Sequence, residues 1–342
     1  MPKKYLITGG AGFIGCNYVA RLIKRGEIVT VFDNLSRKGT SKNLHWLQST
    51  FGEDQFEFIR ADVRDADAME RAARDKDVIV HLAGQVAVTS SIEQPRHDFE
   101  VNATGTFNVL EGARRSEKNP LVVYASTNKV YGEMENVAVA ETANAYVYAD
   151  QPSGIPETQP LDFHSPYGCS KGAGDQYVRD YSRTYGLPTV VMRQSCIYGP
   201  HQLGIEDQGW VAWFIIAAVL GKPITIYGDG KQVRDILFVE DLLDAYDAAV
   251  ANQTTASGEI YNIGGGPTNT MSIWAEFKLY LEALLGKEIN VKYSDWRVGD
   301  QRIYVSDIRK AQSELNWTPK YDIQHGLQRL FDWVVENKDL FD

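Results

Sequence analysis

Cysteine is scarce in this chain of 342 residues, and the three that are present, Cys16, Cys169 and Cys196, lie far apart. None of them belongs to a Cys-x-x-Cys or mixed Cys/His ligand pattern. The sequence therefore predicts neither a disulfide framework nor a zinc site, and we expect no bound metal. The three thiols are expected to line a core or a pocket.

Basic residues are also fewer than acidic ones: the chain has 35 Lys and Arg and 45 Asp and Glu, which gives a formal net charge of -10. A nucleic-acid scaffold needs clustered basic residues to neutralise phosphates, so this class of protein is disfavoured. The apolar runs are too short to cross a bilayer, and the N-terminus leads into strand-like sequence without a signal-peptide pattern. We expect a cytoplasmic protein with no nucleic-acid or membrane partner.

What the sequence does contain is an alternation of strand-like and helix-like segments. Apolar runs rich in β-branched and aromatic residues predict strands at residues 3–7, 28–32, 56–60, 78–82, 121–125 and 189–193. Helices are expected at 17–25, 67–74, 101–116 and 170–185. The strand runs lack polar alternation, which is typical of parallel strands covered on both faces. The pattern predicts an α/β fold with a Rossmann-type doubly wound parallel sheet.

The regular alternation loosens after about residue 199, where short segments rich in Gly and aromatics predict a smaller mixed α/β domain. We expect a dinucleotide-binding domain at 1–193, to which 232–263 contributes, and a substrate domain at 194–342. Residues 133–165 form a long irregular insertion, and loops of this length are usually functional or disordered.

Three glycines, Gly9, Gly12 and Gly15, lie between the first predicted strand and helix. At this place, missing side chains let the backbone approach a pyrophosphate at the helix N-terminus. Asp33 ends the second strand, where a carboxylate binds ribose hydroxyls and repels a 2′-phosphate, so NAD is favoured over NADP. Arg37 and Lys38 follow closely and weaken that preference. The alternative is a plain tight turn with a solvated carboxylate.

Further candidates for the cofactor site follow the third and fourth strands. Asp62 is placed to accept a hydrogen bond from an adenine amino group, or else to cap the next helix. Small residues at 82–85 end the fourth strand, and Asn102 is either a cofactor contact or an ordinary cap. The full expected cofactor set is Gly9, Gly12, Phe13, Ile14, Gly15, Asp33, Asn34, Ser36, Arg37, Asp62, Val63, Leu82, Ala83, Gly84, Gln85, Asn102, Tyr167 and Lys171.

Tyr167 and Lys171 lie four residues apart at the start of a predicted helix, so they share one face. A lysine cation and a positive nicotinamide both favour the phenolate, which can then remove and return a hydroxyl proton. Such a pair is common by chance, but Thr127 ends the fifth strand at the edge where α/β sheets bind ligands. Ser126 is the neighbouring alternative, although alternation along a strand points only one of the two inward.

The chain resembles the extended short-chain dehydrogenases/reductases that act on nucleotide sugars, over nearly its whole length. The resemblance rests on TGGAGFIG at 8–15, YGCSK at 167–171, RDILFVED at 234–241 and RVGD at 297–300. It implies NAD as cofactor, a catalytic triad of Thr127, Tyr167 and Lys171, and phosphate contacts from Arg234 and Arg297. Either arginine could instead form a surface ion pair. The resemblance also implies a homodimer or homotetramer.

Asn128 and Lys129 follow Thr127 where dehydratases of this family carry an Asp-Glu acid/base pair. Without that pair, reversible oxidation at one carbon remains, which predicts an epimerase. Within the family, the stretches 33–39, 84–87, 126–132, 162–171 and 207–210 resemble the CDP-hexose 2-epimerases. This resemblance implies a CDP-sugar substrate, either CDP-paratose/CDP-tyvelose or CDP-glucose/CDP-mannose. Alternatives are a UDP-hexose 4-epimerase and a non-catalytic NAD-binding regulatory protein.

The expected substrate contacts are Gln85, Thr127, Asn128, Lys129, His164, Ser195, Cys196, Arg234 and Arg297. Several of these have plainer alternatives. Cys196 stands where 4-epimerases carry an Asn, and it is either a pocket-lining thiol or, less plausibly, an acid/base group. Lys129 contacts sugar hydroxyls or is solvated, and His164 borders the pocket or is a loop residue without such a role. Trp210, Trp213 and Phe214 have the spacing of a core or subunit interface rather than a base-stacking platform.

Overall fold

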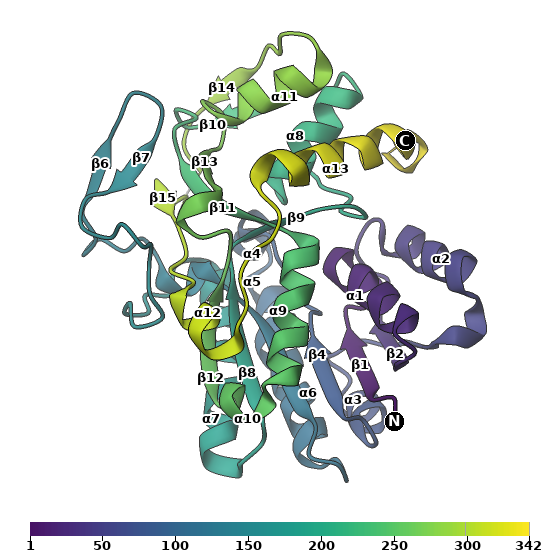
Figure 1. Ribbon diagram of the computed structural model, residues 1–342. Coiled ribbons are helices and arrows are strands. Elements are labelled where there is room, and N and C mark those ends of the chain that lie inside the picture. The colour runs from purple at the N-terminus through teal and green to yellow at the C-terminus, as the bar shows by residue number, and fades with distance from the viewer. Residues whose placement is uncertain (298, 342) are drawn as a thin grey trace. The chain divides into compact units, whose positions relative to one another are not determined.

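The computed structural model describes residues 1–297 and 299–341. They form two compact units (Figure 1). The first consists of residues 1–127, 165–193 and 245–261, and the second of residues 128–164, 194–244 and 262–342. We expected the insertion and the segment 232–263 in the first domain. Residues 133–164 and 232–244 instead belong to the second unit, and 245–261 belongs to the first. Among the described residues, no helix has the length and apolarity to cross a membrane.

A seven-stranded sheet is the centre of the first unit, with the order β12-β8-β5-β4-β1-β2-β3. Its strands are β1 (Lys4–Thr8), β2 (Ile28–Asp33), β3 (Glu57–Arg60), β4 (Val78–His81), β5 (Leu121–Thr127), β8 (Thr189–Gln194) and β12 (Glu259–Ile263). β1 pairs in parallel with both β2 and β4, and β4 pairs in parallel with β5. The six predicted strands and the parallel sheet are confirmed, within one or two residues at each end.

Helices cover both faces of this sheet, as expected for a doubly wound fold. The helices of the unit are α1 (Phe13–Lys24), α2 (Thr40–Phe51), α3 (Ala66–Ala73), α4 (Val88–Glu93), α5 (Pro95–Phe99), α6 (Gly105–Arg114), α7 (Ser165–Tyr185) and α10 (Gln253–Ala256), with a π-helical turn at Glu100–Thr104. α9 (Val239–Ala251) ends in this unit. On one face, Tyr18 of α1 contacts Tyr5 of β1 and Tyr246 of α9.

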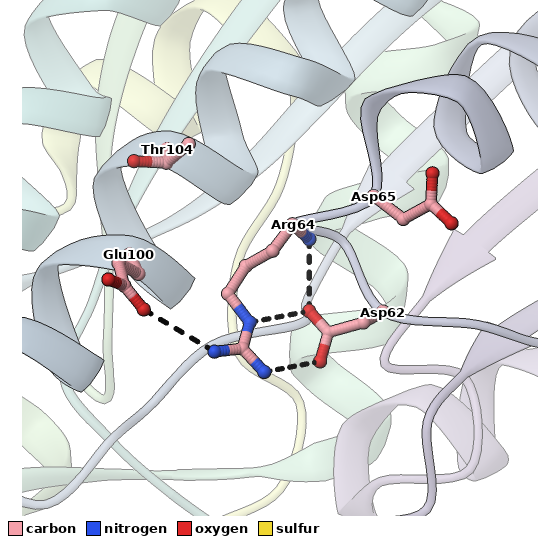
Figure 2. Close-up of a pocket in the computed structure, with 5 residues that line it drawn as sticks. All are labelled: Asp62, Arg64, Asp65, Glu100 and Thr104. Carbon is pink, nitrogen blue, oxygen red and sulfur yellow. Dashed lines mark hydrogen bonds and ion pairs between the residues drawn. The ribbon is translucent and has the colours of Figure 1, made fainter.

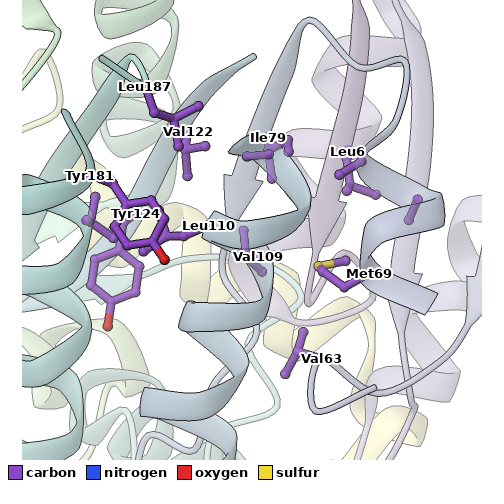
Figure 3. Packing of buried hydrophobic residues seen from close by; sticks show 14 of the residues in the cluster. Leu6, Val63, Met69, Ile79, Val109, Leu110, Val122, Tyr124, Tyr181 and Leu187 are labelled. Carbon is purple, nitrogen blue, oxygen red and sulfur yellow. The ribbon is translucent and has the colours of Figure 1, made fainter. Parts of the chain in front are cut away.

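The other face carries the largest described core, formed by the sheet with α3, α6 and α7 (Figure 3). Leu6, Ile79 and Val122 of three neighbouring strands meet Met69 of α3 and Val109 of α6. All five are essentially inaccessible to solvent. Because each buried side chain of this size contributes about 1.5–3 kcal/mol, this core holds the carboxyl ends of the strands in fixed positions.

The second unit is built around β11 (Val233–Phe238), which pairs in parallel with β9 (Cys196–Tyr198) and β15 (Ile303–Tyr304) and antiparallel with β13 (Thr270–Ser272). Two strand pairs accompany this sheet: β10 (Thr225–Tyr227) with β14 (Lys292–Ser294), and the hairpin β6 (Val139–Glu141) with β7 (Tyr146–Tyr148). Its helices are α8 (Trp210–Val219), α11 (Phe277–Leu285), α12 (Arg309–Leu315) and α13 (Ile323–Glu336). The sequence did not indicate the hairpin, which occupies part of the long insertion.

Candidate active site

The glycine turn after β1 is too tightly packed for side chains. A Cβ on Gly15 would lie 2.2 Å from the carbonyl oxygen of Gly9, and one on Gly9 would lie 2.7 Å from the backbone nitrogen of Ala83. Gly9 also has a φ of +68°, which few residues other than glycine adopt. α1 begins directly after Gly12, and no side chain caps it. Its first N–H groups are thus available to a phosphate, so the turn fits a dinucleotide.

Asp33 holds a carboxylate at the end of β2. One of its oxygens accepts from the backbone N–H of Ala11 at 3.1 Å and the other from that of Leu35 at 2.8 Å. Burial raises the pKa of this carboxyl group, and the two hydrogen bonds oppose the rise. Asn34 and Ser36 follow in a turn closed by a hydrogen bond from the Ser36 N–H to the Asn34 side chain, at 3.0 Å.

Asp62 lines an open pocket with Arg64, Asp65, Glu100 and Thr104 (Figure 2). The guanidinium of Arg64 donates to both carboxylate oxygens of Asp62, at 3.0 and 2.9 Å, and lies 3.5 Å from Glu100. Because of these bonds, the pKa of Asp62 falls to about 2. Asp65, not Asp62, caps α3. An adenine amino group would share Asp62 with Arg64.

Asn102 does not cap a helix. It is buried within the π-helical turn, and its amide forms two reciprocal hydrogen bonds with the backbone of Gln85, at 2.9 and 3.0 Å. These bonds fix the segment that follows β4, where a Cβ on Gly84 would lie 3.0 Å from the Asn102 side-chain oxygen and 4.0 Å from Lys171 Nζ. The expected cofactor segment 82–85 is therefore held beside Lys171.

Thr127, Tyr167 and Lys171 are brought together by β5 and α7. The side chains of Thr127 and Tyr167 are hydrogen-bonded to each other. Lys171 Nζ donates to the carbonyl of Ala125 at 2.6 Å and lies 4.3 Å from the centre of the Tyr124 ring. Ser126 points to the other side of the strand and donates to Asp175 at 2.6 Å. The alternation along β5 thus separates Thr127 from its neighbouring alternative.

Burial shifts the pKa values of both residues. Burial raises the pKa of Tyr167 to about 12, and the hydrogen bond from Thr127 and the charge of Arg37 oppose the rise. Burial also lowers the pKa of Lys171 to about 7, against the charges of Asp175 and Asp98. Asp98 and Asp175 are site residues that the sequence analysis missed, because no motif contains them.

The second unit holds most of the expected substrate contacts. The Arg234 guanidinium donates to Asp300 at 2.7 Å and to the Gln301 carbonyl at 2.6 Å, while Arg297 pairs with Asp207 at 3.1 Å. The guanidinium carbon of Arg297 also lies 3.9 Å from the centre of the Tyr227 ring. Both arginines thus have ion-pair partners in the chain. Val298, in the middle of the RVGD motif, lies outside the described residues.

Lys129 and Asn128 approach the segment that carries these partners. Lys129 Nζ donates to the Gly299 carbonyl at 3.3 Å, and Asn128 contacts the Gln301 side chain at 3.5 Å. Burial and the neighbouring charge of Arg234 lower the pKa of Lys129 to about 8.

The remaining expected contacts of this unit have ordinary surroundings. Burial raises the pKa of the Cys196 thiol, which disfavours the reactive thiolate form of this residue. The Ser195 hydroxyl is bonded to Asp235, and His164 is an exposed residue 3.7 Å from Glu133. Trp210 and Phe214 pack against Phe277 in an aromatic core.

The chain matches the family model for GDP-mannose 4,6 dehydratase over residues 6–330. It is 46% identical to the CDP-paratose 2-epimerase of Salmonella typhi, over 97% of this chain and 99% of the relative. Among solved structures, it is similar to a UDP-glucose 4-epimerase of Thermotoga maritima, with a TM-score of 0.83, 30% identity and coverage of 98% and 99%.

A dTDP-glucose 4,6-dehydratase of Streptomyces venezuelae, solved with NAD, is also similar, with a TM-score of 0.84, 30% identity and 99% coverage of both chains. NAD is likewise bound in a similar UDP-glucose 4-epimerase of Thermus thermophilus. The chain therefore belongs to the GDP-mannose 4,6-dehydratase family of extended short-chain dehydrogenases/reductases, in which it is an NAD-dependent nucleotide-sugar epimerase.

Proposed function

We propose that the chain epimerises a CDP-hexose at C2, by transient oxidation to a 2-keto sugar, rotation of that ketone and reduction on its other face. The observation that carries this proposal is the 46% identity to a CDP-paratose 2-epimerase over nearly the full length of both chains. The candidate substrates are CDP-paratose, which would give CDP-tyvelose, and CDP-glucose, which would give CDP-mannose. A UDP-hexose 4-epimerase is the second candidate, supported by the fold of the Thermotoga maritima enzyme.

In this proposal, the Tyr167 phenolate removes the proton of the reacting hydroxyl and later returns it. Thr127, which is bonded to Tyr167 in the free chain, turns its one hydroxyl proton to the same substrate oxygen and orients it. Lys171 holds a positive charge beside the phenolate when it is protonated. The glycine turn and Asp33 would hold NAD, which would supply the acceptor and donor of the hydride at the reacting carbon. Asn128 and Lys129 supply no carboxylic acid, which disfavours loss of water.

We assign the diphosphate of the substrate to Arg234 and Arg297. Arg234 Nη2 donates to Asp300 and Gln301, and Nη1 donates to the Val233 carbonyl; because a guanidinium has five donors, others remain for phosphate oxygens. Arg297 would exchange Asp207 for the diphosphate. Lys129, Asn128, Ser195, Cys196, His164 and Gln85 are assigned to the sugar, with Cys196 as a pocket-lining thiol because its pKa is raised.

A homodimer or homotetramer is part of the same proposal. Three exposed aromatic rings gather on α6 and α7, where Phe107 contacts Tyr177 and Tyr185 packs on the buried Tyr181. Aromatic side chains are enriched at protein interfaces, so this surface fits a second copy of the chain. The expected cytoplasmic location stays a prediction.

The experiment that tests the proposed reaction is incubation of the NAD-loaded protein with CDP-paratose, CDP-glucose and UDP-glucose in parallel, with the products identified by NMR. We expect a C2 epimer from at least one CDP-sugar. UDP-galactose as the only product would establish the 4-epimerase alternative. No turnover of any of the three would favour the non-catalytic alternative.

A further inference from the structure

Asp98 is a buried carboxylate that the proposed reaction does not use. Its exposed fraction is 0%, and it lies on the short helix α5. One oxygen accepts from the Ser170 hydroxyl at 2.5 Å and the other from the Asn102 amide at 3.1 Å. The Asn102 amide and the Ser170 hydroxyl are also 3.0 Å apart, which closes a triangle of three buried polar side chains. Burying such a charge is costly, so its retention calls for a role.

Both hydrogen-bond partners of Asp98 are connected to Tyr167 or Lys171. Ser170 directly precedes Lys171 on α7, and its hydroxyl oxygen lies 3.2 Å from the carbonyl oxygen of Tyr167. Asn102 is bonded to the backbone of Gln85, next to the glycine that lies beside Lys171. A single side chain from α5 thus fixes both the first turn of α7 and the segment after β4.

We propose that Asp98 is a positioning residue, which holds the first turn of α7 through Ser170 and Asn102 and sets the pH range of the reaction through its buried negative charge. The proposal rests on the proposed catalytic roles of Tyr167 and Lys171.

The direction of this effect follows from the charges that surround the pair. Arg37, from the loop after β2, lowers the pKa of Tyr167, whereas Asp98 raises it. Asp98 and Asp175 both raise the pKa of Lys171 against the effect of burial. His81 of β4 and Tyr124 of β5 also face this cluster, and burial keeps both neutral near pH 7. His97 and Lys171 act on Asp98 itself and favour its charged form.

Removal of the Asp98 charge must therefore lower the pKa of Tyr167 and of Lys171 together. The reaction needs Tyr167 deprotonated and Lys171 protonated, so both limbs of the kcat–pH profile would move to lower pH. If Asp98 had a purely structural role, its substitution would reduce kcat without moving either limb of the profile. The shift of both limbs in one direction is the signature of the charge.

Asp98→Asn is suited to this test because an amide can rebuild the triangle. Its oxygen accepts from Asn102, its NH2 group donates to Ser170, and the Ser170 hydroxyl turns to the Tyr167 carbonyl. Asp180→Asn, on the exposed side of the same helix α7, is the matched control with the same change of charge. We expect both limbs of Asp98→Asn to move down by ~0.5–1 pH unit, and those of Asp180→Asn to stay in place.

A second measurement does not depend on turnover. The near-ultraviolet phenolate absorbance of the NAD-loaded parent, minus that of Tyr167→Phe, isolates the titration of Tyr167. The same difference in the Asp98→Asn background should have its midpoint at lower pH. If Tyr167 titrates with the same midpoint in both backgrounds and the limbs of the kcat–pH profile do not move, the proposed role of the Asp98 charge is overturned.

Should Asp98→Asn fail to fold, Ser170→Ala tests the positioning role alone, because it keeps the carboxylate and removes its link to Tyr167. We expect a kcat at least several-fold lower with KM little changed, and an unchanged kcat would overturn that role. An inactive parent, or an active Tyr167→Phe variant, would instead refute the proposed function on which the inference rests.

Discussion

Asp175 and Arg193 form an ion pair inside the first unit, with two hydrogen bonds of 2.9 Å between the guanidinium and the two carboxylate oxygens. The exposed fractions of the two side chains are 0% and 2%. Ser126 donates to the same carboxylate at 2.6 Å, so the pair joins α7 to β5 and β8 directly behind Thr127 and Lys171. The strand and the helix that carry the proposed catalytic residues are thus held together by polar contacts as well as by apolar packing.

Loss of one partner of this pair would leave a buried charge without compensation. We predict that Asp175→Ala lowers the free energy of unfolding by about 3–5 kcal/mol. Ser126→Ala, which removes a single hydrogen bond to the same carboxylate, should cost about 1–3 kcal/mol. Chemical denaturation measures both changes. Equal and small losses for the two variants would show that the ion pair does not hold this part of the unit.

Tyr167→Phe removes the hydroxyl group while keeping the ring. If Tyr167 transfers the proton, kcat should fall by roughly 10²–10⁴-fold, with little change in the melting temperature. Tyr185→Phe, at the exposed end of the same helix, is the control and should keep the parent's kcat. Comparable rates for the parent and the Tyr167 variant would remove this residue from the mechanism.

The fold of the first unit was largely predictable from the sequence because its strands are continuous apolar runs. The same edge of the sheet gathers Thr127, Tyr167 and Lys171, so strand ends and one helix spacing were enough to predict their proximity. β11 was harder, since Val233–Phe238 interrupts its apolar residues with Arg234 and Asp235, and its sequence does not show which sheet buries it. Its partners, β9, β13 and β15, are short segments with weak patterns of their own.

Asp98 and Asp175 were missed for a related reason. Asp98 lies just before a predicted helix and Asp175 lies on one. An Asp in such a place ordinarily faces solvent, and nothing in the local sequence shows that a distant Ser170 or Arg193 will bury it. Asp62 illustrates the reverse, because the sequence offered it as an adenine contact or a helix cap, and the adjacent Arg64 donates to both of its oxygens instead. Pairing between polar side chains is set by the packed fold.

Gly15→Ala tests the glycine turn. The added methyl group would lie 2.2 Å from the Gly9 carbonyl oxygen, so the turn must open and its N–H groups must move. We predict NAD affinity reduced by at least tenfold, measured by calorimetry. Gly26→Ala, just beyond the other end of α1, meets no atom within 4 Å but carries a φ of +74°. It should cost about 1 kcal/mol of stability and leave NAD affinity unchanged. Equal affinities for the two variants would contradict the role of the turn.

His81 predicts a dependence of stability on pH. Burial lowers its pKa in the folded chain to about 3, while the unfolded chain retains the ordinary value of about 6.5. As the pH falls below 6.5, the unfolded state gains a proton that the folded state does not, so the contribution of His81 to stability declines. The stability advantage of the parent over His81→Gln should therefore shrink by ~2 kcal/mol between pH 7 and pH 5.

Denaturant titrations of the parent and the His81→Gln variant at the two pH values measure that difference, and other titrating groups cancel because both proteins share them. A difference that stays constant with pH would show that His81 is charged in the folded chain. In that case its bonds to Thr8 and Thr106, at 2.7 and 3.0 Å, would need different donors and acceptors.

In the proposed reaction, one hydride leaves C2 and returns to the same carbon within a turnover. The most direct test uses a CDP-hexose deuterated at C2, incubated with the NAD-loaded protein in ordinary water and analysed by NMR and mass spectrometry. We predict that the epimerised product retains its deuterium at C2. Replacement of that deuterium by hydrogen from water would contradict the account and indicate epimerisation by proton transfer.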